Sequence, residues 1–227
     1  MAENRAQKIL NILTKTFSSP RWITVVDDPF RMLIAAVISQ NTTGKSTTRA
    51  FENLSKRFEI VPEVLANART DQIEECLKPA GLQRNKARTI RQVSRIAHSK
   101  YRGKLKIVLA KPFEEARTEL LQLPGVRRKT ADAVLLFSAH MPTIPVDTHV
   151  SRLSKRLGFA SPKAGYEKVR RSLQSLYNPK DYLQVHISLI SLGREYCRAR
   201  NPVCRQCPFN TLCPSSTVVR QGNDGTA

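Results

Sequence analysis

Apolar residues recur at helical spacing along most of this chain. An α-helix places residues three or four positions apart on one face, so this spacing lets each helix bury a stripe of side chains. Examples are Phe51, Leu54 and Phe58; Ile90, Val93 and Ala97; and Tyr166, Val169, Leu173 and Leu176. We find no convincing run of alternating apolar and polar residues that would build a multi-stranded sheet. The sequence therefore predicts an all-α fold.

Prolines and glycines divide this helical pattern into segments. The breaks fall at Pro62, residues 79–81, Pro112, residues 124–125 and residues 142–145. The last break predicts a hinge between a central bundle and a C-terminal region. The first 21 residues are expected to form an amphipathic helix. Residues 214–227 lack apolar periodicity and are expected to form a flexible tail.

The charge balance indicates a polyanionic partner. The chain carries 38 Lys and Arg against 18 Asp and Glu, a net charge of +20. Such an excess favours DNA, RNA or an anionic membrane and resists self-association, so we expect a monomer. No segment approaches the roughly 20 apolar residues of a membrane span. The first residues also lack the apolar run of a secretory signal. We therefore expect a cytoplasmic, nucleoid-associated protein with no membrane partner.

Four of the five cysteines are clustered near the C-terminus. Cys197, Cys204, Cys207 and Cys213 lie within 17 residues, with six, two and five residues between them. Four thiolates so close together in a reducing compartment predict a metal centre. Structural zinc is one possibility, although its ligands more often come as two close pairs; an iron–sulfur cluster is the other. The fifth, Cys76, stands on an apolar helix face and is expected in the core.

A Pro-Gly turn joins two expected helices over residues 123–130. Pro124 ends the first helix, and Gly125 permits the tight turn. The backbone N–H groups that open the next helix then face outward, where they can bind a phosphate. Lys129 follows the turn directly, and Asp147 comes eighteen positions later. A Pro-Gly turn between helices is common and is weak evidence by itself. We therefore interpret it together with Lys129 and Asp147.

The hairpin, the lysine, the downstream aspartate and the cysteine loop occur in an order that resembles the endonuclease III branch of the helix-hairpin-helix DNA glycosylases. The resemblance covers about residues 5–213. It implies two helical lobes: a central bundle, residues 24–141, and a second lobe formed by residues 1–23 and 142–213. It also implies a [4Fe–4S] cluster on Cys197, Cys204, Cys207 and Cys213, and a double-stranded DNA partner containing damaged bases or abasic sites.

The resemblance implies that Lys129 and Asp147 are catalytic. A lysine amine can attack the sugar C1′ and form a Schiff base, after which β-elimination breaks the strand. Asp147 would stabilise the positive charge on the sugar or assist proton transfer. A helix N-terminus beside Arg127 and Arg128 would lower the pKa of Lys129. The simpler alternatives are a phosphate-contacting lysine and an aspartate that caps the next helix.

A base inside a duplex must be flipped out, and the vacancy is filled by inserted side chains. By resemblance, Gln40 or Asn41 would supply one wedge and Leu82 the other; loop capping and minor packing are the alternatives. Lysines, arginines and the hairpin itself would contact phosphates. The candidate contacts are Lys86, Arg88, Gly125, Arg127, Arg128, Thr130, Arg198, Arg200 and Arg205.

Arg127 departs from the family pattern, which usually has a second glycine at this position of the hairpin. That glycine lets the backbone approach DNA and can adopt a positive φ, which arginine disfavours. We therefore expect a slightly reshaped hairpin, in which the Arg127 side chain contacts a phosphate.

These features together favour a bifunctional DNA glycosylase and AP lyase that acts on oxidised pyrimidines. A mismatch glycosylase, removing thymine or uracil opposite guanine or adenine opposite oxidised guanine, is an alternative. A non-catalytic DNA-binding protein is another. The resemblance weighs against both: mismatch-specific relatives generally lack a lysine at the position of Lys129, and this chain retains Lys129 and Asp147 together.

Overall fold

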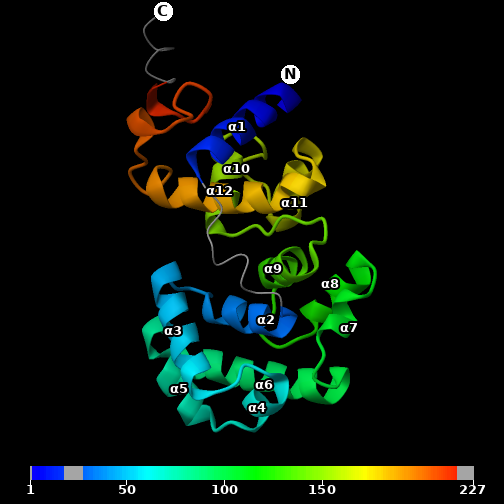
Figure 1. Cartoon of the computed structure of the whole chain (residues 1–227). Coiled ribbons are helices and arrows are strands. Elements are labelled where there is room, and N and C mark those ends of the chain that lie inside the picture. Colours follow the sequence, from blue (N-terminus) through cyan, green and yellow to red (C-terminus); the bar gives the residue numbers. More distant parts are fainter. Residues whose placement is uncertain (1, 18–27, 219–227) are drawn as a thin grey trace, which may run out of the picture. The chain divides into compact units, whose positions relative to one another are not determined.

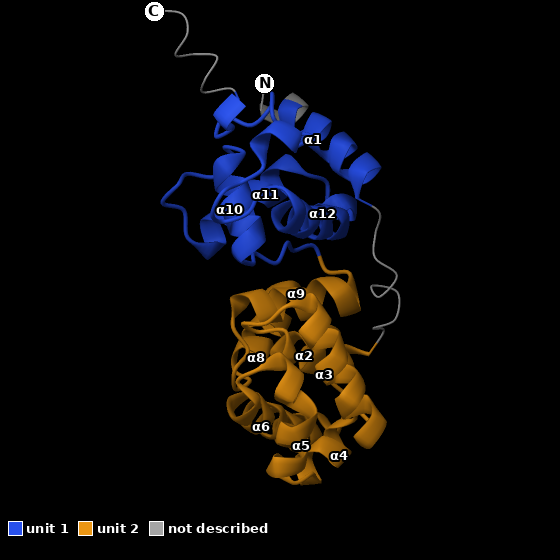
Figure 2. Cartoon of the chain, turned by 90° about the vertical axis from the view of Figure 1, so that its left-hand side faces the viewer, with its two compact units in different colours: residues 1–21, 142–227 blue, residues 22–141 orange. Residues whose placement is uncertain are grey.

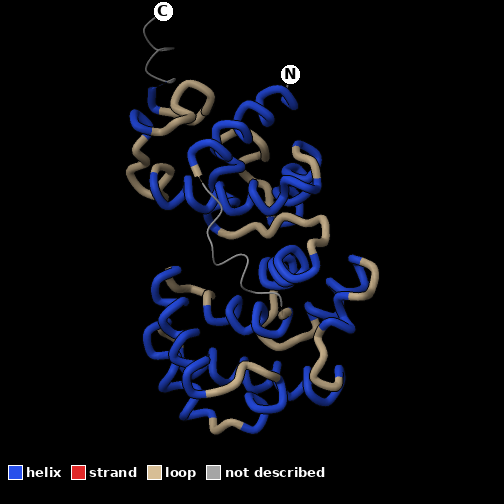
Figure 3. The backbone as a smooth tube through the Cα atoms, in the orientation of Figure 1, coloured by secondary structure: helices blue, strands red, loops and turns tan. Residues whose placement is uncertain are grey.

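The computed structural model describes residues 2–17 and 28–218 of the chain. Within these residues the regular structure is entirely helical, and no strand occurs in them (Figure 3). The predicted all-α fold is confirmed. None of the described helices has the length and apolar character that a bilayer crossing requires.

The chain divides into two compact units (Figure 2). Unit 1 contains residues 1–21 and 142–227, and unit 2 contains residues 22–141. The sequence placed the start of the central bundle at residue 24 and its end at residue 141. The boundary between residues 21 and 22 falls within residues 18–27, which lie outside the described part of the chain.

Unit 2 is built around α2 (Pro29–Ile38), in which every residue except Arg31 and Ala35 is buried. The helix packs against α3, α6 and α9, so it forms the centre of the unit (Figure 1). Its nearly uniform apolar sequence explains this position. The other helices of the unit are α3 (Gly44–Arg57), α4 (Pro62–Asn67), α5 (Thr70–Leu77), η2 (Lys78–Ala80), α6 (Gln83–Tyr101), α7 (Lys106–Leu109), α8 (Phe113–Leu121) and α9 (Arg128–Ala139).

Unit 1 combines the beginning of the chain with its end. The N-terminal helix α1 (Ala2–Thr16) packs on α12 and α11, and the side chains of Ile9 and Leu13 are fully buried. The expected amphipathic helix is therefore present, and Arg21 lies outside the described residues. The remaining helices are α10 (Thr148–Arg156), α11 (Tyr166–Leu176), η3 (Pro179–Asp181), α12 (Tyr182–Glu195) and η4 (Cys204–Gln206).

Residues 214–218, the start of the expected flexible tail, contain one buried residue. Ser216 is 1% exposed, and its N–H donates to the Cys213 carbonyl at 2.9 Å. Backbone bonding of this kind needs no apolar periodicity, which is why the sequence pattern missed it. Residues 219–227 lie outside the described part of the chain.

Candidate functional site

The hairpin between α8 and α9 requires glycine at position 125 for two reasons. Gly125 has φ +71°, a left-handed conformation that other residues seldom adopt. A Cβ at this position would also lie 2.5 Å from Cγ2 of Thr89 on α6. The turn is closed by a hydrogen bond from Val126 N–H to the Leu123 carbonyl at 3.1 Å. The hairpin therefore packs directly on α6.

Arg127 fits the hairpin without a positive φ. Its backbone is extended, with φ −105° and ψ 173°, and it is the N-cap residue of α9. Any residue adopts this conformation, so the reshaping expected from the missing glycine is not needed. Arg127 and Arg128 are both exposed, which leaves their side chains in a position to meet phosphates.

Lys129 lies on the first turn of α9 and is half-buried. The N-cap residue of the helix is Arg127, and its side chain forms no capping hydrogen bond. The first N–H groups of an α-helix have no partner within the helix and carry its positive dipole end. Thr130, by contrast, is 2% exposed. Its side chain therefore faces the interior of the unit, which differs from the expected contact with DNA.

The two candidates for the first wedge are separated by the structure. Gln40 is half-buried, and its Nε2 donates to the Gly125 carbonyl at 3.0 Å and to Thr130 Oγ1 at 3.4 Å. Asn41 is exposed and has φ +53°. Gln40 is therefore tied to the hairpin, whereas Asn41 projects from the turn after α2.

Leu82 stands out as an exposed apolar side chain at the start of α6. It is 55% exposed and has φ +51°, directly after Gly81 with φ +66°. A left-handed backbone is uncommon for a residue other than glycine. The role of Leu82 as the second wedge stays a prediction.

The structure places Lys86 in the interior, contrary to the expected surface contact with phosphate. It is 4% exposed, and its Nζ donates to the Ala80 carbonyl at 2.9 Å. Burial lowers the pKa of Lys86. The ammonium group therefore closes the loop that carries Leu82. Arg88, two residues further along the same helix, is exposed.

A buried ion pair, which was not predicted from the sequence, joins the two helices of the hairpin. Arg117 on α8 donates from Nε to Asp132 Oδ1 at 2.6 Å and from Nη2 to Oδ2 at 3.3 Å. Asp132 is fully buried, and the Arg117 side chain is 11% exposed. A single sequence gives no signal for this pair, because both residues are ordinary on a helix surface.

In unit 1, Asp147 caps α10. Its carboxylate accepts a hydrogen bond from Val150 N–H at 2.7 Å, so the capping role predicted as an alternative is confirmed. The segment before it is also fixed, because His186 Nδ1 contacts the Pro145 carbonyl at 2.9 Å. Asp147 is half-buried. The cap leaves the second carboxylate oxygen able to interact with a positively charged group.

Two arginines of α10 reach the first cysteine of the cluster loop. Arg152 Nε donates to the Cys197 carbonyl at 2.9 Å, and its Nη2 contacts the Gly193 carbonyl at 3.2 Å and His149 Nδ1 at 3.0 Å. Arg156 Nη1 lies 3.2 Å from Cys197 Sγ. Neither arginine was predicted from the sequence as a site residue. Their spacing of four positions on the helix that Asp147 opens was the available signal.

The contact between α10 and α12 is close at His149. A Cβ on Gly193 would lie 2.6 Å from His149 Nδ1, so only glycine fits there. Burial lowers the pKa of His149; Arg152 and Arg194 act in the same direction, and Asp147 opposes them. The imidazole therefore favours its neutral form in the folded protein.

Cys197, Cys204, Cys207 and Cys213 line one cavity of about 310 Å³. Burial raises the pKa of the Cys207 thiol to about 11 and also raises that of Cys213. Metal ions that bind the four sulfurs as thiolates would make this gathering of cysteines favourable. Within the described residues, no three potential ligands are arranged to hold a single ion. The all-sulfur donor set fits a metal cluster.

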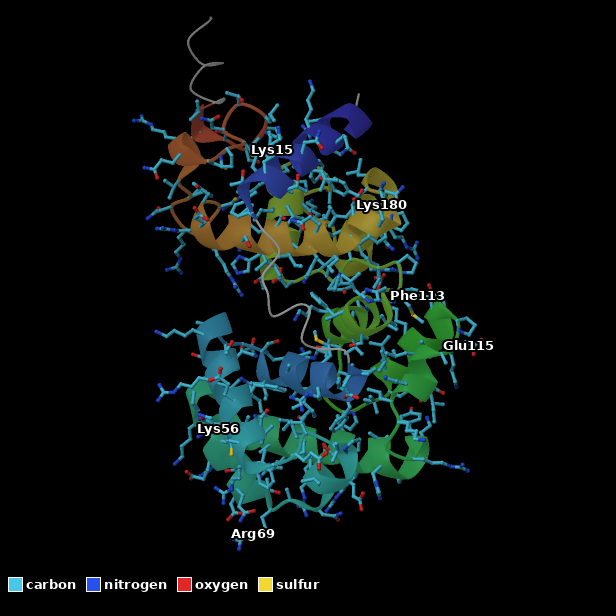
Figure 4. All side chains as sticks on the ribbon, viewed as in Figure 1. Lys15, Lys56, Arg69, Phe113, Glu115 and Lys180 are labelled. Carbon is cyan, nitrogen blue, oxygen red and sulfur yellow. The ribbon has the colours of Figure 1, made fainter. Side chains whose placement is uncertain are left out.

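Basic side chains extend from both units. Lys15, Lys56, Arg69 and Lys180 are exposed and lie in different parts of the chain (Figure 4). Around the cysteine loop, the predicted contacts Arg198, Arg200 and Arg205 are all exposed. Exposed basic side chains are therefore found in both units of the described chain.

Comparisons with known proteins agree with this geometry. The family described as "HhH-GPD superfamily base excision DNA repair protein" matches residues 34–179. Endonuclease III of Thermotoga maritima is 35% identical over 186 residues, which are 82% of this chain and 83% of the relative. Endonuclease III of Bacillus subtilis is 33% identical over 83% of this chain and 82% of its own.

Two solved structures of endonuclease III with DNA are similar over nearly the whole chain. A non-covalent complex has a TM-score of 0.83 at 30% identity and covers 97% of this chain and 98% of its own. A trapped covalent intermediate has a TM-score of 0.79 at 30% identity and covers 94% and 96%. The chain therefore belongs to the endonuclease III family, within the helix-hairpin-helix superfamily of base excision DNA repair proteins.

Proposed function

We propose that this protein excises oxidised pyrimidines from duplex DNA and then cleaves the abasic site through a Schiff base on Lys129. Its class, a bifunctional DNA glycosylase and AP lyase of base excision repair, follows from its family. The substrate and the residue roles are our inference. The observation that carries them is the position of Lys129 on the first turn of α9, directly behind the hairpin.

Lys129 would act as the nucleophile. Its amine lone pair forms a bond to C1′ of the sugar, and the damaged base leaves with the electrons of the glycosidic bond and takes up a proton. Opening of the sugar ring gives the Schiff base. Loss of a C2′ proton then expels the 3′ phosphate by β-elimination. The dipole of α9, together with Arg127 and Arg128, would favour the neutral amine that this attack needs.

Asp147 would stabilise positive charge on the sugar as the base departs. A carboxylate that already accepts one hydrogen bond from its own helix is held in a defined orientation, so little reorganisation is needed during the reaction. The same group can pass a proton to or from the sugar oxygen. Its capping role and its catalytic role are therefore compatible.

Asn41 and Leu82 would enter the duplex when the base is flipped out, since both are exposed and both have left-handed backbone conformations. Arg88, Arg127 and Arg128 in unit 2 would contact phosphates. Arg198, Arg200 and Arg205 in unit 1 would do the same. These contacts position the protein without reading the sequence.

Cys197, Cys204, Cys207 and Cys213 would hold a [4Fe–4S] cluster. When bound, such a cluster fixes the loop between the cysteines and keeps all four sulfurs as thiolates. Arg152 and Arg156 would connect this loop to α10 through Cys197.

Borohydride trapping tests the proposal. The parent protein and Lys129→Gln are incubated with a duplex that contains thymine glycol, and with a second duplex that contains a pre-made abasic site. We expect covalent adducts of the parent on both duplexes and none with the variant. An adduct on the abasic duplex alone would refute the oxidised-pyrimidine substrate. No adduct of the parent on either duplex would refute Schiff-base catalysis.

A further inference from the structure

Gln40 connects the turn after α2 to both sides of the hairpin. Its Nε2 donates to the carbonyl of Gly125 at 3.0 Å and to the hydroxyl of Thr130 at 3.4 Å. Gly125 forms the turn itself, and Thr130 is the neighbour of Lys129 on the first turn of α9. The amide therefore spans the segment that leads from the turn to Lys129.

The peptide between Gly125 and Val126 is held at both ends. Its N–H donates to the Leu123 carbonyl at 3.1 Å, and its carbonyl oxygen accepts from Gln40. A peptide unit is planar, so two bonds on opposite sides fix its orientation. Glycine restricts the adjoining torsions least of all residues. Without Gln40, this peptide would be the part of the hairpin with the most freedom to rotate.

The hairpin is also held by side-chain and backbone packing, and the hydrogen bonds of Gln40 add to this packing. Gly125 already touches Thr89 on α6, where no larger residue fits. Helix α2, which ends two residues before Gln40, packs along α9 (Figures 1 and 2). The hairpin is therefore fixed by packing against two helices and oriented by one side-chain amide.

We propose that Gln40 is a positioning residue, which orients the hairpin and the first turn of α9 so that Lys129 is placed for attack on the sugar. The link to catalysis rests on the proposed role of Lys129. The two residues of the turn after α2 then have different roles. Gln40 orients the hairpin, and Asn41 enters the DNA.

Three substitutions separate the hydrogen bond from the shape of the side chain. Gln40→Met keeps the length but removes the donor, Gln40→Glu replaces the donor by an acceptor, and Gln40→Lys restores a donor. Glu52→Gln, an exposed position on α3 of the same unit, is the matched control. Strand cleavage of a pre-made abasic duplex is measured in a single turnover at saturating protein, and the Kd for the same duplex is measured separately.

We expect the cleavage rate of Gln40→Met to fall about tenfold, the effect of one net hydrogen bond, with little change in Kd. Gln40→Glu should be slower still, and Gln40→Lys should recover most of the rate. A role in packing alone would give similar rates for Met, Glu and Lys. A role in binding DNA would change Kd and leave the saturated rate unaltered. Either result overturns the proposal.

Hydrogen exchange of the free protein gives an independent measurement. Amides in residues 123–130 should exchange faster in Gln40→Met than in the parent and in Glu52→Gln, because the hairpin opens more often. This readout needs no catalysis. If the parent forms no Schiff base, the proposed function fails while the exchange result still decides whether Gln40 orients the hairpin. Unchanged exchange would refute the positioning role.

Discussion

At the residue scale, Gly125 shows why one position in the hairpin tolerates no other side chain. Its positive φ and its contact with Thr89 are separate constraints, and a substitution meets both at once. A left-handed backbone costs a residue with a Cβ about 1–2 kcal/mol. Overpacking a filled contact costs about 1–3 kcal/mol. The two constraints can be separated because only one of them involves Thr89.

Gly125→Ala should therefore lower the free energy of unfolding by about 3 kcal/mol. Adding Thr89→Ala should recover the part due to the clash and leave the part due to φ. Urea unfolding of the parent, both single variants and the double variant measures the interaction energy. Strictly additive effects would show that the contact with Thr89 carries no energy.

A second prediction at this scale concerns His149. Its pKa is lowered in the folded state, mainly by burial. The unfolded chain binds a proton near the ordinary histidine value of about 6.5, whereas the folded chain resists it. The free energy of unfolding is therefore unaffected by His149 above that pH. It decreases as the pH falls below that value, because the unfolded chain takes up the proton more readily. The melting temperature of the parent should drop between pH 7.5 and 5.5 by more than that of His149→Gln. Parallel pH profiles would contradict this.

At the element scale, the hairpin helices α8 and α9 are joined by the buried pair of Arg117 and Asp132. Removing one partner of a buried pair leaves an uncompensated charge, whereas replacing both by apolar residues often costs little. The two outcomes differ enough to be measured.

Asp132→Asn should cost about 3–5 kcal/mol of stability, and the double variant Arg117→Met with Asp132→Leu should cost less. Chemical unfolding of both, with Arg69→Gln as an exposed control, provides the comparison. Equal losses in the single and double variants would mean that the pair itself is net stabilising.

The sequence predicted the helices better than it predicted the burial and contacts of individual side chains. Helical periodicity gave the all-α fold, and proline and glycine marked the hairpin, because both signals act through neighbouring residues. The position of Lys86 could not be predicted in this way. Its charge suggested an exposed side chain, yet the side chain is buried and its Nζ donates to the Ala80 carbonyl. Gln40 and Arg152 act through contacts with residues 85 and 45 positions away, respectively, which one sequence does not report.

At the scale of the whole molecule, the net charge of +20 should govern the affinity for DNA. Each phosphate contact releases a counterion, so the logarithm of the binding constant falls linearly with the logarithm of the salt concentration. Arg198, Arg200 and Arg205 are exposed beside the cysteine cavity and are the clearest candidates for such contacts in unit 1.

Replacing any one of these three arginines by glutamine should reduce the salt slope by about one. The effect should be the same for damaged and undamaged duplexes, since phosphate contacts carry no sequence information. Arg69→Gln is the control, because Arg69 is already paired with Asp71 at 2.7 Å. Binding measured from low to high salt gives the slopes. A loss confined to damaged DNA would indicate a base contact instead.

The discontinuity of unit 1 has a consequence for how the protein is made. Helix α1 packs on α12, but about 165 residues separate the two along the chain. At a ribosome speed of about 5–20 residues per second, α1 waits roughly 8–30 seconds for that partner. Its apolar face, with Ile9 and Leu13, stays uncovered during this interval. Unit 2 can fold meanwhile, so α1 is made before unit 2 and yet reaches its place after it.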